Sequence, residues 1–104
     1  MVFDEIDTGL GGTTAKVVAE CIAKVAKSKQ VLCVTHLAQI ACMADTHLQI
    51  SKSDDGNRTV TQIKTLDAES RVFEIARMAS GAENSVSLEN AAAMIQSAKK
   101  FCAL

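Results

Sequence analysis

The stretch VFDEIDTGLGG, residues 2–12, decides the fold that we expect for this chain. Two apolar residues, Val2 and Phe3, lead into the adjacent carboxylates Asp4 and Glu5, and a glycine-rich segment follows. A short apolar run is typical of a buried strand, and a carboxylate at its carboxyl end faces the crevice where open α/β sheets bind ligands. Residues 1–4 are therefore predicted to be the end of a strand whose start is missing.

The acids at this strand end have the chemistry of a Walker B element. Mg²⁺ prefers hard oxygen ligands and keeps much of its water shell, so that Asp4 can hold the ion through water. The adjacent carboxylate of Glu5 can take a proton from an attacking water when its pKa suits that task. An acidic strand end is also commonly a solvated turn, and the pattern alone fits both interpretations.

A second polar group follows the next apolar run. Residues 30–34, QVLCV, read as a strand buried on both faces, and Thr35 and His36 come directly after it. Neighbouring strands lie about 4.8 Å apart, so that pairing with residues 1–4 brings His36 and Glu5 to the same edge. A neutral imidazole there can hydrogen-bond a γ-phosphate or the attacking water. A purely structural histidine is the alternative.

The remaining segments complete an α/β pattern. A helix over residues 11–29, capped by Thr13 or Thr14, joins the two strands into a βαβ unit. A short helix over 37–45 follows, and then two alternating strands, 47–53 and 58–66, pair through a turn with one face packed and one wet. The last two expected helices span residues 69–80, ended by Gly81, and 87–102, capped by Ser87.

Helical spacing predicts which side chains of these helices are buried. The expected buried residues of the first helix and of the helix over 69–80 are Ala15, Val18, Ile22, Val25, Val72, Ile75, Ala76 and Ala79. Methionine packs flexibly, and we expect Met43, Met78 and Met94 to fill the core. Arg71 and Arg77 are expected to face solvent, with an approach of Arg71 to the nucleotide or a partner lobe as the alternative.

Composition limits the classes of function. The chain has 104 residues, enough for a single domain, with 48% apolar and 22% charged residues. Its net charge of −1 gives no basic field for nucleic acid, so these residues are not expected to hold DNA themselves. No apolar run approaches the roughly 20 residues of a membrane span, and no membrane partner is expected. Reduced, buried cysteines in the cytoplasm are predicted at positions 21, 33, 42 and 102.

Four segments in this order resemble the C-terminal end of the head of ABC-type ATPases in the structural-maintenance-of-chromosomes group, in particular those of bacterial DNA repair. The segments are VFDEIDTGLGG, QVLCVTHLAQIA, ADTHLQISK and SRVFEIARMASG. The resemblance runs over nearly the whole chain. It implies the C-terminal lobe of a RecA-like P-loop ATPase head: a parallel βαβ unit, a hairpin and two helices, forming one partial domain over residues 1–104.

The resemblance also implies roles for single residues. Asp4 resembles the Walker B aspartate near Mg²⁺, Glu5 the catalytic base, and His36 the switch histidine that senses the γ-phosphate of ATP. Asp7, Thr8 and Gly9 belong to a segment that resembles the D-loop, which contacts the second head of a dimer. Many D-loops end in Leu-Asp, whereas Leu10-Gly11 stands here, so Asp7 is only a loose substitute for that aspartate.

The phosphate-binding loop of such an ATPase is absent from the sequence. No G-x-x-x-x-G-K-[ST] motif occurs in the 104 residues, and the signature segment and the N-terminal lobe are missing as well. We therefore expect a fragment of a split head, inactive alone in ATP hydrolysis and double-strand-break repair. Its partners would be the N-terminal lobe, a second head and, through the full-length protein only, DNA at the bacterial nucleoid.

A missing phosphate-loop strand would leave residues 30–34 with an exposed apolar edge, and exposed edges recruit other strands. The isolated fragment is accordingly expected to dimerise, to swap elements or to repack its hairpin into the gap.

Two other functions remain open from the sequence. Cys33, His36, Cys42 and His47 are ligand types that suit a small zinc module, although their spacing is not that of a familiar finger. A non-catalytic interaction or regulatory domain that has lost hydrolysis is the other alternative. The turn at residues 54–57 lacks the alternating acids and closing Glu of a calcium loop.

Overall fold

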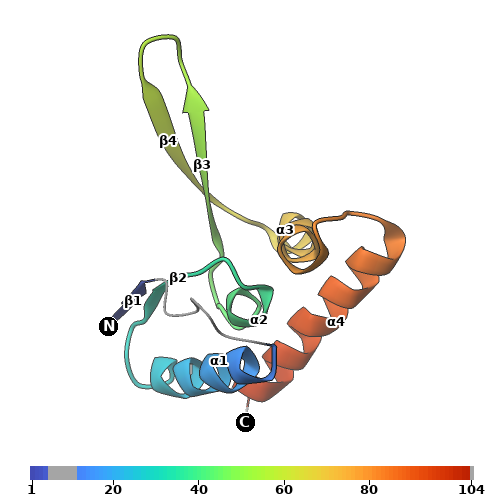
Figure 1. Ribbon diagram of the computed structural model, residues 1–104. Helices are drawn as coiled ribbons and strands as arrows, with labels where there is room; N and C mark the ends of the chain where they lie inside the picture. Colours follow the sequence, from blue (N-terminus) through green and yellow to red (C-terminus); the bar gives the residue numbers. More distant parts are fainter. Residues whose placement is uncertain (5–11, 104) are drawn as a thin grey trace.

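The computed structural model describes residues 1–4 and 12–103. Their fold is α/β, with one parallel and one antiparallel strand pair and four helices (Figure 1). The elements in chain order are β1 (Val2–Asp4), α1 (Gly12–Ala26), β2 (Leu32–Val34), α2 (Ala38–Ala41), β3 (Leu48–Asp54), β4 (Thr59–Thr65), α3 (Ala68–Ser80) and α4 (Ser85–Cys102). The expected βαβ unit, hairpin and two C-terminal helices are thereby confirmed.

The two N-terminal strands pair in parallel. Val2 lies opposite Leu32, and Asp4 lies opposite Val34. The backbone N–H of Leu32 donates to the Met1 carbonyl at 2.9 Å, which extends the pairing by one residue. Helix α1 makes the crossover between the strands, as the sequence pattern predicts.

One face of this parallel pair is open. Val2 is 66% exposed, Leu32 54% and Val34 40%, whereas Phe3 and Cys33 on the other face are half-buried. The prediction that residues 30–34 are buried on both faces is wrong for this chain. Alternate side chains of a strand point to opposite faces, and within the described residues nothing covers the face that carries Leu32 and Val34.

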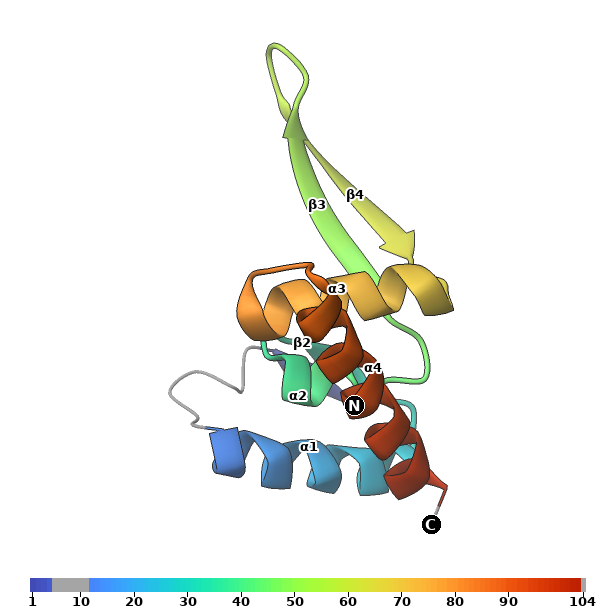
Figure 2. The same ribbon diagram turned by 90° about the vertical axis from the view of Figure 1, so that its right-hand side faces the viewer.

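The core lies among the helices. Helix α3 packs against α4, while α2 contacts both α1 and α3 (Figure 2). Ile75 is fully buried at the centre, with Ala76, Ala91 and Ile95 around it. Small alanine side chains let the helix axes approach closely, and the partly buried methionines 43, 78 and 94 fill the margins as expected. In α1 the buried residues are Ala15, Ala19 and Ala23, while Val18, Ile22 and Val25 are only partly buried.

The helix ends correct two sequence-based expectations. Thr13 and Thr14 lie inside the first turn of α1, which begins at Gly12, and so are not its caps. Helix α4 begins at Ser85, two residues before the expected start, because the Asn84 side chain accepts the backbone N–H of Ser87 at 2.9 Å. Asp67 caps α3 in the same way, and Gly81, with φ 71°, ends α3 as predicted.

The β3–β4 hairpin projects away from the helices and does not fill the gap beside β2 (Figure 1). Its cross-strand pair Ile50 and Ile63 is 56% and 66% exposed, and Leu48 is 44% exposed. The expected packed face is therefore open. At the hairpin base, Gln49 Nε2 donates to Glu74 Oε2 on α3 at 2.6 Å, which fixes the point where the hairpin leaves the body.

The cysteines are only partly as expected. Among the described residues no disulfide bond joins any of the four cysteines, Cys21, Cys33, Cys42 and Cys102. Cys42 is buried, whereas Cys21 is exposed on α1, so its predicted burial is wrong. Burial raises the pKa of the Cys42 thiol, an effect that the nearby Arg71 charge partly offsets. Among the described residues, none of the helices has the length and apolar character needed to traverse a lipid bilayer.

Candidate functional site

The carboxyl ends of β1 and β2 lie level with each other. Asp4 ends β1 and stands in register with Val34, which ends β2, so that His36 follows two residues beyond the same edge. The side chains of both Asp4 and His36 are exposed. The structure thus brings two of the sequence-predicted site residues to one sheet edge. Glu5, Asp7, Thr8 and Gly9 lie outside the described residues.

A local turn carries the chain from β2 past His36 into α2. Thr35 Oγ1 accepts the backbone N–H of Leu37 at 3.0 Å, which closes a turn around His36. Leu37 takes the cap position of α2 without a side-chain cap. The strand end and the helix start therefore fix the backbone on both sides of His36.

The zinc and magnesium predictions have different outcomes. Among residues 1–4 and 12–103, no three or more His, Cys, Asp or Glu side chains gather as a metal site. Cys33, His36, Cys42 and His47 all belong to those residues, so the zinc-module alternative is contradicted. Mg²⁺ in phosphate-transfer sites uses one or two carboxylates with waters and substrate phosphates, and the exposed Asp4 carboxylate fits one such position.

Arg71 is the main feature that sequence reasoning missed. Its Nη2 donates to the carbonyl oxygens of Ala41 at 3.2 Å, Cys42 at 2.9 Å and Ala44 at 2.7 Å. The expectation that Arg71 faces solvent is therefore wrong. Residues four apart share a helix face, and Arg71 lies one turn before the buried Ile75. That spacing is the signal that places its side chain over the core.

Glu74 is a second buried charge on α3. It is only 8% exposed and accepts from Gln49 and from Arg77, whose Nε lies 3.2 Å from Glu74 Oε2. The ion pair with Glu74 raises the pKa of Arg77, whose own side chain is 57% exposed, in line with its expected solvent-facing position. Apolar spacing alone did not indicate that a carboxylate of this helix is buried.

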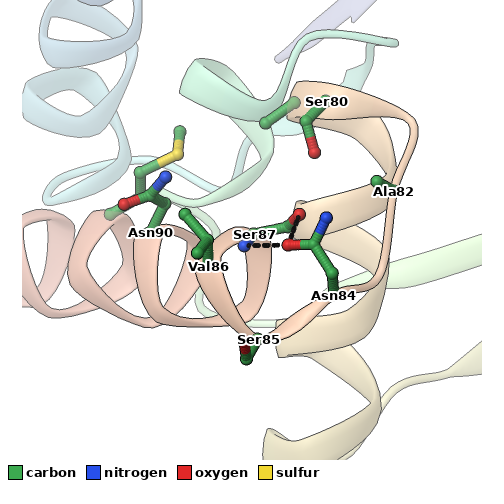
Figure 3. A pocket seen from close by; sticks show the side chains of 9 residues that line it. Ser80, Ala82, Asn84, Ser85, Val86, Ser87 and Asn90 are labelled. Atoms are coloured by element: carbon green, nitrogen blue, oxygen red, sulfur yellow. Dashed lines mark hydrogen bonds between the residues drawn. The ribbon is translucent and has the colours of Figure 1, made fainter.

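A hollow of about 560 Å³ lies at the corner between α3 and α4 (Figure 3). No charged side chain lines it. Asn84 Oδ1 is engaged by both the N–H and the hydroxyl of Ser87, and the Ser80 hydroxyl donates to Ala76 O at 3.0 Å. These three polar side chains thus already form hydrogen bonds within the helix ends. The hollow therefore has few polar groups available to bind a ligand.

A parallel strand–helix–strand unit, followed by an antiparallel hairpin and two C-terminal helices, is consistent with a partial ATPase-head lobe. The chain is similar to the DNA repair protein RecN of Bacillus subtilis, with 51% identity over 83 residues, 80% of this chain and 14% of that protein. It is 49% identical over 83 residues to DNA repair protein RecN of Halalkalibacterium halodurans.

A third relative, DNA repair protein RecN of Deinococcus radiodurans, is 46% identical over 91 residues, 88% of this chain and 16% of that protein. No family model matches the chain. Over about four-fifths of its residues the chain is similar to RecN proteins, which confirms the resemblance found in the sequence. It spans about 15% of the length of these relatives.

Proposed function

We propose that this chain supplies the Walker B part of an ATP-hydrolysing head that acts in DNA repair. The single observation that carries the proposal is the register of Asp4 with Val34, which sets the carboxylate of Asp4 and the side chain of His36 at one sheet edge. The identity of about half of the matched residues with RecN proteins supports the link to DNA repair.

Each residue of the edge has a distinct role in this proposal. Asp4 holds Mg²⁺ through water, which leaves the ion free to contact substrate phosphates. Glu5 takes the proton of the attacking water, and His36 hydrogen-bonds that water or the γ-phosphate. Asp7, Thr8 and Gly9 contact a second head. ATP bound with Mg²⁺ supplies the phosphoryl group, and the rest of the head cradles its phosphates.

The complementary lobe is the first partner that we propose. The chain lacks the Gly-rich loop that cradles phosphates, so a second segment must bring that loop to Asp4. The exposed Val2, Leu32 and Val34 form an apolar face on the parallel pair, as expected of a surface that a complementary lobe covers. Other parts of the protein bind the DNA, since this chain has a net charge of −1. The proposed place of action is the bacterial nucleoid in the cytoplasm.

Reconstitution tests this function. The chain is mixed with a polypeptide that carries the phosphate-loop portion of Bacillus subtilis RecN, and ATP hydrolysis is measured. We expect activity only in the mixture, and we expect Glu5→Gln to lower its rate by about 10²–10⁴-fold, the usual range for loss of a general base.

Glu89→Gln is the matched control, because Glu89 is an exposed carboxylate on α4, and its rate should be that of the unchanged chain. A mixture in which Glu5→Gln hydrolyses ATP as fast as Glu89→Gln would contradict the proposed role of Glu5.

A non-catalytic interaction domain is the second candidate, and the exposed Ile50 and Ile63 of the hairpin favour it. It predicts that the chain binds the complementary polypeptide equally well with and without ATP, and that no hydrolysis follows. The same mixture therefore distinguishes the two functions.

A further inference from the structure

A second hollow, of about 380 Å³, lies where the segment before β3, the β4–α3 connection, α3 and α4 meet. Ligand pockets of proteins begin at about 300 Å³, so this hollow has room for a small molecule. Arg71, His47 and Lys99 line it, whereas Asp4 and His36 are not among its lining residues. The proposed ATPase chemistry does not use it.

Two residues that line this hollow each carry a buried polar atom with no hydrogen-bond partner within the described part of the chain. These atoms are Nε of Arg71 and Nδ1 of His47. Arg71 donates from Nη2 to backbone carbonyl oxygens, whereas its Nε donates to no acceptor among the described residues. Buried polar groups are nearly always satisfied in native proteins, so such a pair lining one hollow indicates a missing partner.

Arg71 also has no ion-pair partner among the described residues. The hydrogen bonds and ion pairs of the described residues give its guanidinium carbonyl oxygens but no carboxylate. Burial lowers the pKa of His47, the positive charge of Arg71 lowers it further, and the carboxylate of Glu74 partly offsets both effects. A partly buried cation needs an anion more than it needs another neutral acceptor.

Two acids also line the hollow, and neither forms an ion pair with Arg71 among the described residues. Asp67 uses its carboxylate to accept the backbone N–H of Ser70 at 2.8 Å, as the cap of α3. Asp45 is exposed. Lys99 on α4 adds a second cation at the exposed side of the hollow.

We propose that this hollow binds a small oxyanion, the carboxylate or phosphate group of a small molecule, between Arg71 Nε, His47 and Lys99. Arg71 donates from a guanidinium already fixed by the carbonyl oxygens of Ala41, Cys42 and Ala44, so that little side-chain freedom is lost on binding. His47 donates from Nδ1, and Lys99 contributes charge.

The ring signals of His47 in an NMR spectrum test this directly, because the sequence has only two histidines and His36 serves as the internal reference. Inorganic phosphate and acetate are titrated separately, with sodium chloride at matched ionic strength as the blank. We expect a saturable shift of the His47 signals with one or both oxyanions and none with chloride. The oxyanion that saturates at lower concentration identifies the preferred group.

Variants on the exposed side of α4 separate a site from general ionic effects without touching the core. Lys99→Gln and Gln96→Glu should each weaken oxyanion binding several-fold, since both positions line the hollow. Lys100→Gln removes a neighbouring charge that does not line it and should leave binding unchanged. Shifts that match the chloride blank, or that respond equally to Lys99→Gln and Lys100→Gln, would overturn the proposal and leave water as the partner of these atoms.

Discussion

Arg71 Nη2 lies 2.7 Å from the carbonyl oxygen of Ala44 and ties α3 to the segment that follows α2. The same nitrogen donates to Ala41 and Cys42 at the end of α2. The last carbonyl oxygens of a helix have no hydrogen-bond partner within the helix and carry partial negative charge. A guanidinium supplies both the hydrogen-bond donors and the opposite charge. Because α2 begins directly after the turn at His36, Arg71 also helps to hold the edge of the candidate site.

Replacing Arg71 with methionine should destabilise the chain. Arg71→Met keeps the length of the side chain but removes the Nη2 donor of three backbone carbonyl oxygens, of which that of Ala41 keeps only the backbone N–H of Ala44. We expect the free energy of unfolding to fall by about 2–3 kcal/mol, the upper range for hydrogen bonds from a charged group, as measured by urea denaturation. Arg58→Met at the exposed hairpin turn is the control, and an equal loss in both variants would refute the structural role of Arg71.

Glu74 should hold the hairpin to α3. Glu74→Ala removes the acceptor of Gln49 Nε2 and of Arg77, and we expect a loss of about 1–2 kcal/mol. Hydrogen exchange of the backbone amides should become faster at the base of the hairpin, near Gln49 and Lys64, more than at its tip. Unchanged exchange at Gln49 would show that the hairpin is oriented by other contacts.

Asn84, not Ser87, should be the cap of α4. Asn84→Ala removes the acceptor of the Ser87 N–H and should cost about 1 kcal/mol of stability. Ser87→Ala keeps that backbone hydrogen bond and loses only the hydroxyl contact to Asn84, so its cost should be smaller. Thermal unfolding of the two variants decides the order, and a larger loss for Ser87→Ala would restore the sequence-based assignment.

Stability should depend on pH through His47. Its pKa in the folded chain lies below the ordinary 6.5, chiefly because of burial and secondarily because of Arg71. Between the folded and the unfolded pKa of His47, the unfolded chain therefore binds more protons than the folded chain. The contribution of His47 to stability is complete above pH 6.5 and is lost as the pH falls toward the folded pKa.

Urea denaturation between about pH 5 and pH 8 measures this slope, a range set by the usual titration of histidine. His47→Gln removes the titrating group and should flatten the slope in that range. A slope that survives in His47→Gln must arise from another group.

The sequence predicts the order of the elements because each depends on local signals. Alternation marks the strands of the hairpin, and Gly81 marks the end of α3. The burial of β2 could not be predicted in the same way, since an apolar run indicates a strand buried on both faces only when the rest of its sheet is present. Arg71 and Glu74 were missed because apolar periodicity does not predict which polar side chains are buried. Their burial depends on hydrogen bonds to a neighbouring backbone or amide group.

Of the candidate site, the sequence predicts that His36 and Glu5 emerge at one sheet edge. Glu5 lies outside the described residues, and the register of Asp4 with Val34 brings Asp4 and His36 to that edge. The second hollow could not be predicted, because His47, Arg71 and Lys99 come from separate parts of the chain and meet only in the folded structure.

Binding of ATP in the presence of Mg²⁺, measured by calorimetry, tests the central claim most directly. It is measured first on the 104-residue chain alone and then on its mixture with the phosphate-loop polypeptide. We predict no detectable heat from the chain alone and saturable binding by the mixture, weakened by Asp4→Asn. Clear binding of ATP by the chain alone would contradict the account, because it would mean that these residues form a phosphate site without the complementary lobe.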